Sequence, residues 1–442
     1  MQKQIILILS SLVCFSSLYG SYTLKEGTRA KSRIDQMPKN SVADMKQIPQ
    51  NPSFYANQIK PFPAHKQRVL DNTFNRKYFE PWHINLLDIP QNELGWETRF
   101  VTHQKLYRLD RSIIPATVYE KWIDNANYAE INTKRYKAIT ICHTDLKALP
   151  TSEAFYKDPK ETGEGFPFNY NQNSSLHINI PLFISHFSKD WRWAFVRASY
   201  GFGWVKVSDL ALVDAAFMRT FKNDHYAIVI KDNLQLDKNN QKISIVKTGA
   251  LFPIAGENLY YIASRDEKAR AHLETVRAQD PNIIAPKPLP FTPENVAMLA
   301  KEFYGEPYGW GGGYECRDCS STTRDFLGAF GIFLRRNSSK QAQDGRTVFI
   351  GGLDKKQKKN AIIKQSEPFR SILYVPGHVV LYLGQYKGEP VIMHTYWGIR
   401  KKDGTKLITG RTIITSTEPG KERADVKEQS KLINTLQTII NF

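Results

Sequence analysis

The chain has 442 residues, about three times the ~150 residues of a typical domain, so we expect more than one domain. Hydrophobic residues make up 41% of it and charged residues 24%, which excludes a wholly disordered, collagen-like or coiled-coil protein. The 61 basic and 43 acidic residues give a formal net charge of +18, which suits an anionic partner such as nucleic acid, a membrane surface or a cell-wall polymer without choosing among them. Its four cysteines are too few for a disulfide-rich scaffold.

Residues 1–20 are predicted to form a secretory signal peptide. Lys3 supplies a positive start, Ile5 to Phe15 is an almost unbroken apolar run, and small residues suited to cleavage follow. The run is shorter than the ~20 residues of a membrane span. Cys14 could be an acylation site, but Val13 stands where a small residue is needed, so we expect no lipid anchor. The sequence therefore predicts an exported protein of the periplasm or cell envelope, without nucleic acid as a partner.

Residues 21–136 are expected to form an N-terminal arm and a stabilising helical region. The prolines between Gln36 and Pro63 favour an extended arm or linker, and a helix is predicted around Pro115 to Asn125. Lysine runs elsewhere in the chain are interpreted as solvated surface that helps adhesion to acidic wall material.

Two β-rich units follow, without a strict sequence repeat between them. Short β-prone runs between turn clusters predict a small β-barrel over residues 137–213, and a second, shorter one over residues 214–265. The tryptophans of the first unit, Trp191, Trp193 and Trp204, could stack on a ligand, but alternating strand tryptophans more often fill a barrel core. Residues 266–290 are expected to contain a polar helix near Lys268 to Gln279, and then a proline-rich linker.

Residues 291–442 are predicted to form the last domain. Thr292 can cap a helix that ends at Gly305. A glycine-rich loop, Pro307 to Gly313, then leads to Cys319, which opens a second stretch with apolar residues at helical spacing. Cys319 is therefore expected at a helix N-terminus. Unpaired backbone N–H groups and the helix dipole stabilise a thiolate there, so we expect the pKa of the Cys319 thiol to fall below its ordinary ~8.5. The same N–H groups can stabilise an oxyanion.

A thiolate nucleophile needs a base, and two histidines have suitable contexts. His378 opens a predicted strand, His378 to Leu383, and His394 closes another, Val391 to His394. Antiparallel pairing of these strands would bring both imidazoles to one edge of a sheet. His378 would then accept the thiol proton, while His394 would bond to its other ring nitrogen and fix its tautomer. Each histidine alone could be an ordinary strand-end residue, but with Cys319 they predict a catalytic site.

Four motifs of this region occur together: Tyr308-Gly309-Trp310-Gly311-Gly312, Asp318-Cys319-Ser320-Ser321, Gly377-His378-Val379 and His394. Together they resemble the NlpC/P60 family of cell-wall cysteine peptidases. Further stretches resemble the larger multidomain members: Phe330-Gly331-Ile332 and Arg336-Asn337-Ser338. Stretches upstream resemble two bacterial SH3-like domains: Leu149-Pro150-Thr151, Phe166-Pro167-Phe168 and Gln172-Asn173-Ser174 for the first, and Asp232 to Pro253 for the second.

The resemblance implies an α+β fold, in which a papain-like catalytic domain follows two small SH3-like β-barrels and the N-terminal arm. It implies a thiol protease that hydrolyses the γ-D-glutamyl–diamino acid (diaminopimelate) bond of peptidoglycan stem peptides or muropeptides. No cofactor and no metal are implied, and we expect a monomer that associates peripherally with the cell wall.

The resemblance also implies roles for six residues. Cys319 would be the nucleophile, His378 the base and His394 the orienting third member, and Tyr308 would place its hydroxyl near the oxyanion. The residues flanking the cysteine, Asp318 and Ser320, would hold the free amine of an N-terminal L-alanine, a task that suits a carboxylate because a buried ammonium needs a paired charge. Ser320 could instead serve only as a helix cap.

Several alternatives concern the same residues. Cys316 and Cys319 have the C-x-x-C spacing of a redox pair, although the βαβ context of a thioredoxin-like site is missing. Zinc could recruit both cysteines and both histidines, but a second paired ligand cluster is missing. The glycine run is not a phosphate cradle, because no Gly-Lys-Ser/Thr follows it. A Ser320 nucleophile would leave the thiol at the helix start unexplained.

Two other function classes stay open. The chain could be a wall-binding or scaffold protein with a degenerate catalytic domain, although every catalytic position holds a competent residue. It could also be an acyltransferase that uses the same nucleophile, since an amine can resolve a thioester in place of water.

Overall fold

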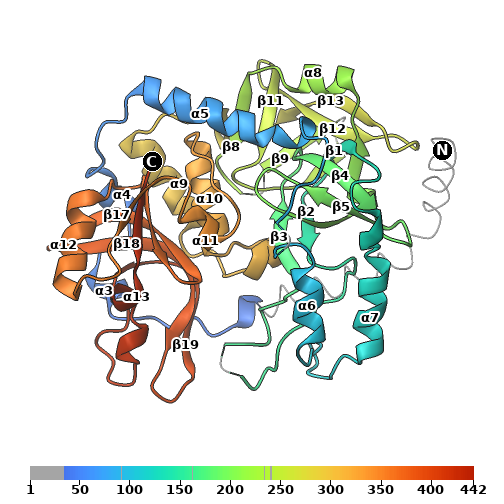
Figure 1. Cartoon of the computed structure of the whole chain (residues 1–442). Coiled ribbons are helices and arrows are strands. Elements are labelled where there is room, and N and C mark those ends of the chain that lie inside the picture. Colours follow the sequence, from blue (N-terminus) through green and yellow to red (C-terminus); the bar gives the residue numbers. More distant parts are fainter. Residues whose placement is uncertain (1–33, 91, 162, 233, 239–240) are drawn as a thin grey trace. The chain divides into compact units, whose positions relative to one another are not determined.

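The computed structural model describes residues 34–442 apart from 91, 162, 233 and 239–240, so the expected signal peptide and Cys14 lie outside the described residues. The described chain divides into two compact units (Figure 1). Unit 1 contains Asn75–Lys287, and unit 2 contains Ile34–Phe74 together with Pro288–Phe442. Within the described ranges, no helix is both long and apolar enough to cross a membrane.

Unit 1 begins with helices that pack around aromatic side chains. The predicted helix around Pro115 to Asn125 is confirmed as α7, and Pro115 stands at its N-cap. Trp122 of α7 stacks on Phe155, with 5.8 Å between ring centroids, and lies in a buried cluster with Val101 of α6. The helical elements of this region are η2 (Glu80–Trp82), α6 (Trp96–Thr102), α7 (Ala116–Asn125) and η3 (Tyr128–Glu130).

The first sheet of unit 1 has seven antiparallel strands in the order β3-β2-β6-β5-β4-β1-β7. Trp193 and Trp204 are buried in its core with Phe183 and Phe195, so two of the three tryptophans fill the core. A Cβ on Gly203 would lie 2.5 Å from the Lys147 carbonyl oxygen, so only glycine allows this strand to approach so closely. The strands are β1 (Tyr136–Thr140), β2 (Thr144–Lys147), β3 (Gln172–Leu176), β4 (Pro181–Phe187), β5 (Trp193–Arg197), β6 (Phe202–Lys206) and β7 (Leu210–Leu212).

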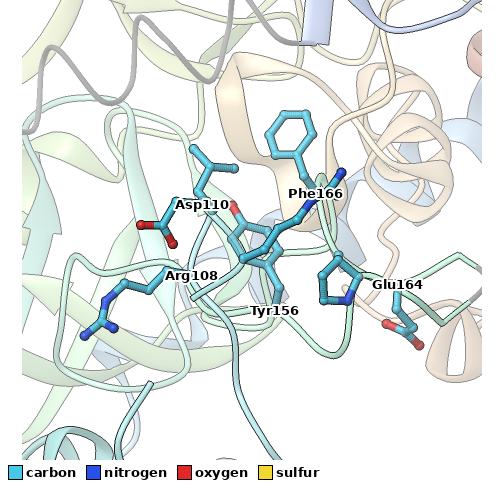
Figure 2. A pocket seen from close by; sticks show the side chains of 9 residues that line it. Arg108, Asp110, Tyr156, Glu164 and Phe166 are labelled. Carbon is cyan, nitrogen blue, oxygen red and sulfur yellow. The ribbon is translucent and has the colours of Figure 1, made fainter. Parts of the chain in front are cut away.

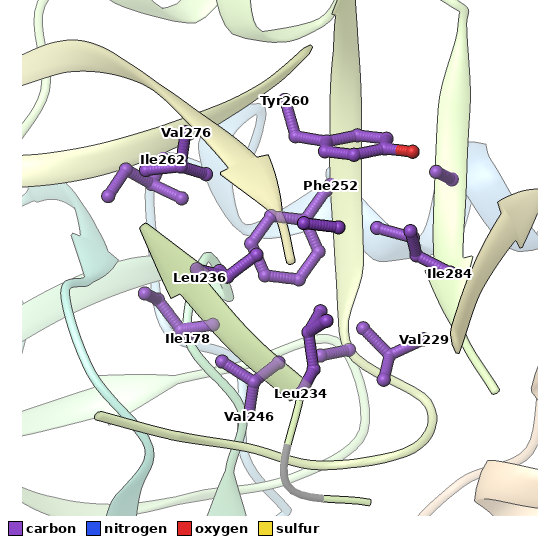
Figure 3. Close-up of a cluster of buried hydrophobic side chains, with 13 residues drawn as sticks. Ile178, Val229, Leu234, Leu236, Val246, Phe252, Tyr260, Ile262, Val276 and Ile284 are labelled. Atoms are coloured by element: carbon purple, nitrogen blue, oxygen red, sulfur yellow. The ribbon is translucent and has the colours of Figure 1, made fainter. Parts of the chain in front are cut away.

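The second sheet of unit 1 also has seven strands, in the order β10-β9-β13-β12-β11-β8-β14, and follows α8 (Ala215–Phe221). Its core contains Phe252, Leu236 and Ile262 (Figure 3). The strands are β8 (Tyr226–Val229), β9 (Leu234–Lys238), β10 (Gln241–Val246), β11 (Leu251–Gly256), β12 (Leu259–Arg265), β13 (Ala271–Ala278) and β14 (Ile284–Pro286).

The polar helix predicted near Lys268 to Gln279 is wrong, because this segment forms strand β13. Its residues favour helix locally, but β13 pairs with β12 along its whole length, from Leu259↔Arg277 to Arg265↔Ala271. The second sheet also includes β14 from the expected linker, so it extends to Pro286, beyond the expected boundary at residue 265.

Unit 2 is built on a six-stranded antiparallel sheet in the order β15-β20-β16-β17-β18-β19. Ile362 of α12 (Lys355–Gln365) packs with Val380 and Ile392 in one buried cluster, whereas the Thr322 hydroxyl of α10 (Cys319–Ala329) hydrogen-bonds that of Thr395 on β18. Because side chains alternate along a strand, α10 and α12 cover opposite faces of the β17–β18 hairpin (Figure 1). The strands are β15 (Arg346–Phe349), β16 (Ser371–Val375), β17 (His378–Tyr386), β18 (Glu389–Arg400), β19 (Lys406–Ser416) and β20 (Thr438–Asn441).

The longer helices of unit 2 start and stop where the sequence predicts. Thr292 caps α9, and its side chain accepts the Asn295 N–H. Gly305 and Gly331 follow α9 and α10 with φ of +83° each, a left-handed conformation that glycine adopts at low cost. The helices are α9 (Pro293–Phe303), η6 (Trp310–Glu315), α10 (Cys319–Ala329), α11 (Ser338–Gln341), α12 (Lys355–Gln365), η7 (Glu428–Ser430) and α13 (Leu432–Thr435).

The N-terminal arm, Ile34 to Phe74, is part of unit 2 and is not merely extended, since it contains α3 (Asp44–Gln47), α4 (Pro52–Ala56) and most of α5 (Ala64–Tyr78). Gln58 exchanges two hydrogen bonds with the backbone of Gln385, at 2.8 and 2.9 Å. Asp44 is buried and accepts hydrogen bonds from the backbone and the hydroxyl of Ser416, at 2.8 and 2.7 Å. The arm is therefore hydrogen-bonded to β17 through Gln58 and to β19 through the buried Asp44 carboxylate.

Candidate active site

A capping box formed by Asp318 and Ser321 fixes the start of α10, the helix that carries Cys319. The Asp318 carboxylate accepts the Ser321 N–H at 2.9 Å, and the Ser321 hydroxyl accepts the Asp318 N–H in return, at 2.9 Å. The preceding glycine loop turns through left-handed conformations at Gly311 and Gly312. Cys319 thus occupies the first position of α10, as predicted.

The Cys319 thiol is buried against the start of strand β17. The backbone N–H of Val379, the residue after His378, and that of Ser320 both hydrogen-bond the sulfur. Burial, and then the nearby Asp318 carboxylate, raise the pKa of the thiol to about 12, against the lowering effect of those N–H groups and of Arg336. The expected low pKa is therefore wrong, because loss of hydration outweighs the helix-start donors that sequence reasoning considered.

His378 and His394 are brought together by the β17–β18 hairpin. Nε2 of His378 lies 3.0 Å from Nδ1 of His394, and Nε2 of His394 lies 3.1 Å from the Thr415 hydroxyl on β19. The ring of Tyr396 stacks on His394, with 4.6 Å between centroids. His394 does not close its strand as predicted, because β18 continues to Arg400 and carries the histidine in its interior.

Burial keeps both imidazoles neutral. It lowers the pKa of His378 to about 4, against a raising effect of the Asp318 charge. Burial, and then the proximity of His378, hold the pKa of His394 well below its ordinary value. A neutral imidazole has one N–H and one acceptor nitrogen, so a neutral His378 can accept a proton.

Asp318 and Ser320 are both bonded within the site. Arg336 donates to both carboxylate oxygens of Asp318, from Nη2 at 2.6 Å and from Nη1 at 3.2 Å, and Nη1 also donates to the Ser320 hydroxyl at 2.6 Å. The backbone N–H of Gly311 adds a further donor to Asp318, at 3.1 Å. Arg336 holds the pKa of the Asp318 carboxyl below its ordinary value although burial acts in the opposite direction. The carboxylate therefore joins the glycine loop, the helix start and Arg336.

Family models match three parts of the chain. They are the NlpC/P60 family over residues 305–403, the SH3 domain (SH3b1 type) over residues 154–206, and the N-terminal NLPC_P60 stabilising domain over residues 9–130. Residues 305–403 therefore form an NlpC/P60 domain, in a chain that also carries the stabilising domain and the SH3b domain. The SH3b match lies in the first sheet of unit 1, where it includes strands β4 and β5.

One of the similar solved structures shares this fold over most of the chain. An NlpC/P60 endopeptidase from Photobacterium damselae subsp. piscicida is 23% identical, and the match covers 91% of this chain and 99% of that chain with a TM-score of 0.81. An NlpC/P60 family protein from Bacillus cereus ATCC 10987 is 15% identical over 69% of this chain and 99% of that chain, with a TM-score of 0.45. No curated protein matches the chain.

Two other predicted residues lie in the NlpC/P60 domain near the glycine loop. Tyr308 is buried, and its ring lies 5.6 Å from that of Trp397. Cys316 and Cys319 are both free thiols, so the C-x-x-C pair is not a disulfide here. Cys316 packs against Gly309, where an added Cβ would lie 2.6 Å from the cysteine Cβ. Across the described residues, no group of three or more His, Cys, Asp and Glu side chains is arranged to hold a metal ion.

Sequence reasoning missed three neighbours of the predicted site: Arg336, Tyr396 and Thr415. The sequence indicates Arg336 only as part of a family motif. Its pairing with Asp318 depends on the burial of both side chains, which the sequence does not show. Nothing local marks Thr415, since it reaches His394 only through the pairing of β18 with β19. Tyr396 follows His394 by two residues on β18, so the alternation of side chains along a strand could have placed both on one face.

A pocket of about 500 Å³ lies in unit 1, lined by aromatic and charged side chains (Figure 2). Its two carboxylates are engaged locally: Glu164 accepts from the Tyr170 hydroxyl at 2.7 Å, and Asp110 accepts from the Ser112 hydroxyl at 2.6 Å. It shares no residue with the site of the NlpC/P60 domain. Its lining is Arg108, Leu109, Asp110, Arg111, Tyr156, Pro159, Glu164, Gly165 and Phe166.

Proposed function

We propose that the chain is a cysteine endopeptidase that hydrolyses the γ-D-glutamyl–diaminopimelate bond of peptidoglycan stem peptides. The observation that carries the proposal is the 3.0 Å contact between the His378 and His394 rings, beside a cysteine at the start of α10 in an NlpC/P60 domain. The domain has the papain-like order of a nucleophile helix followed by an antiparallel sheet that supplies the histidines.

In the proposed mechanism, His378 removes the proton from the Cys319 thiol as the sulfur attacks the γ-carbonyl carbon of D-glutamate. The oxyanion that forms is stabilised by N–H groups at the start of α10, with Tyr308 as a further donor. His378 then gives its proton to the amine of diaminopimelate, and the C–N bond breaks to leave a thioester on Cys319. Water, deprotonated by His378, hydrolyses the thioester and restores the thiol.

The remaining assignments are proposals of the same kind. The second sheet of unit 1 would be a second SH3-like domain that follows the matched one. The protein would act as a monomer in the periplasm or cell envelope, in peripheral contact with the wall, and its net charge of +18 supports attraction to acidic wall material. The amine subsite of Asp318 and Ser320 would bind the free L-alanine amine by displacing a donor already bonded to the carboxylate.

The experiment is incubation of the full chain with L-alanyl-γ-D-glutamyl-diaminopimelate and identification of the products by mass spectrometry. We expect L-alanyl-D-glutamate and free diaminopimelate from the wild type, and no product from Cys319→Ala. Cys142→Ala is a matched control, because Cys142 is a free thiol of unit 1 and should not affect cleavage.

Each alternative has its own outcome. A wild-type protein that binds peptidoglycan without cleaving any stem peptide would support the wall-binding alternative. Products in which an added amine replaces water on the γ-glutamyl group would support acyl transfer. Full activity of Cys319→Ala would end the cysteine-peptidase proposal.

A further inference from the structure

A continuous chain of hydrogen bonds leads from strand β19 to the candidate base. The Thr415 hydroxyl donates to the Ser416 carbonyl at 2.8 Å and lies 3.1 Å from Nε2 of His394. Nδ1 of His394 in turn lies 3.0 Å from Nε2 of His378. Thr415 and His394 are both buried, so bulk water does not replace these partners.

The direction of each bond follows from counting protons. A hydroxyl has one proton, and Thr415 uses it on the Ser416 carbonyl, so its oxygen can only accept from His394. His394 is neutral and therefore carries its single proton on Nε2, which leaves Nδ1 as an acceptor. His378 must then carry its proton on Nε2, and its Nδ1 is left free of a proton.

We propose that Thr415 is a positioning residue that sets the tautomers of His394 and, through it, of His378, so that Nδ1 of His378 stays free to accept the Cys319 proton. The inference rests on the proposed function, because it assigns a cause to the state of the proposed base. Without the Thr415 oxygen, the proton of His394 moves to Nδ1 and points at His378. The proton of His378 is then displaced to Nδ1, where it blocks proton transfer from the thiol.

The N-terminal arm fixes the strand that presents Thr415. The Asp44 carboxylate on α3 accepts from both the backbone N–H and the hydroxyl of Ser416, which adjoins Thr415. The carbonyl that receives the Thr415 proton belongs to this same anchored residue. The hydrogen-bond chain therefore begins on the arm and ends at His378.

The test compares Thr415→Val, which keeps the side-chain shape and removes the hydroxyl, with Thr415→Ser, which keeps the hydroxyl. The full-length variants are labelled with ¹⁵N-histidine, and long-range ¹H–¹⁵N spectra at neutral pH report the tautomer of each ring. We expect the Nε2–H tautomer for His378 and His394 in the wild type and in Thr415→Ser, and a shift toward Nδ1–H at both rings in Thr415→Val. Thermal unfolding controls for loss of fold.

A second readout follows alkylation of Cys319 by iodoacetamide, located by peptide mapping. We expect Thr415→Val to slow this reaction roughly 10–100-fold, as loss of an outer partner of a functional histidine does, and Thr415→Ser to restore it. Unchanged tautomers in a folded Thr415→Val, or an Nδ1–H tautomer of His394 in the wild type, would overturn the inference. Neither readout requires peptide cleavage, so a failure of the proposed function is seen separately as absence of wild-type product.

Discussion

Arg336 donates a hydrogen bond to each carboxylate oxygen of Asp318, with Nη2 2.6 Å from Oδ2 and Nη1 3.2 Å from Oδ1. Asp318 immediately precedes the candidate nucleophile, Cys319. Both side chains are buried. A carboxylate next to Cys319 opposes formation of a thiolate, and the guanidinium compensates for that charge. The pair therefore allows a buried acid to cap α10 while the guanidinium offsets part of its repulsion of a thiolate at Cys319.

Arg336→Gln is expected to slow Cys319 alkylation and to destabilise the fold. The variant leaves a buried carboxylate without its cation, which typically costs about 3–5 kcal/mol, and the unpaired charge raises the thiol pKa further. Urea unfolding measures the first effect and alkylation as a function of pH the second. Arg335→Gln is the matched control, because Arg335 is more exposed and pairs with Asp344 instead. Equal alkylation rates in both variants would contradict the role of Arg336.

His378→Ala and His394→Gln are expected to differ in severity. His378 is the proposed acceptor of the thiol proton, so its removal should abolish cleavage of the tripeptide. Gln can still bond to Nε2 of His378, so His394→Gln should keep a measurable fraction of the activity, on the order of the 10–100-fold loss typical of orienting partners. Single-turnover rates check both. Equal loss in the two variants would show that His394 does more than orient His378.

The acid limb of kcat/KM is expected near pH 4. His378 must be unprotonated to act as a base, and burial places its pKa at about 4, so activity is lost only as the pH falls through that value. The raised pKa of the Cys319 thiol, about 12, further predicts that alkylation of the free enzyme still accelerates through pH 9. A kcat/KM limb near the ordinary histidine value of ~6.5 would instead indicate a solvated base.

Cys316→Ser is expected to keep most of the activity. Cys316 is a free thiol whose sulfur donates to the Tyr314 carbonyl at 3.4 Å, and serine can make a similar bond. Iodoacetamide should label Cys319 in an active preparation of this variant. Loss of activity without unfolding, or a bridged Cys316–Cys319 pair in the active wild type, would restore the redox interpretation.

A free L-alanine amine is expected to be required for rapid cleavage, if Asp318 and Ser320 form the amine subsite. The comparison is between the free tripeptide and its N-acetylated form, which has no ammonium to compete with Arg336 for the carboxylate. We expect the acetylated peptide to react at least ~10-fold more slowly, since a charge-assisted hydrogen bond contributes about 1.5–3 kcal/mol. Equal rates, or faster cleavage of intact sacculi, would assign Asp318 to the helix cap alone.

Those parts of the site that depend on a few neighbouring residues could be predicted from the sequence. The helix start at Cys319, the glycine loop and the strand start at His378 are encoded within a few residues, and each lies where the sequence predicts. The cap itself is Asp318, and not Ser320 as the alternative prediction had it. The pKa of Cys319 could not be predicted, because burial by the rest of the domain decides it. The strand Ala271–Ala278 was missed for a related reason: pairing with β12 overrides its local helix preference.

The anchoring of Ser416 by Asp44 also bears on the order in which the protein assembles during synthesis. Residues 34–74 leave the ribosome before their partners in residues 288–442, so the arm must wait while more than two hundred residues of unit 1 are made. The sheet of unit 2 also needs residues near its C-terminal end, since strand β20 (Thr438–Asn441) pairs with both β15 and β16 and lies between them. Closing such long loops is slow, so we expect the hydrogen bonds that link Thr415, His394 and His378 to form late in folding. The proposed base would therefore acquire its hydrogen-bond partners only after residues 288–442 have been made and folded.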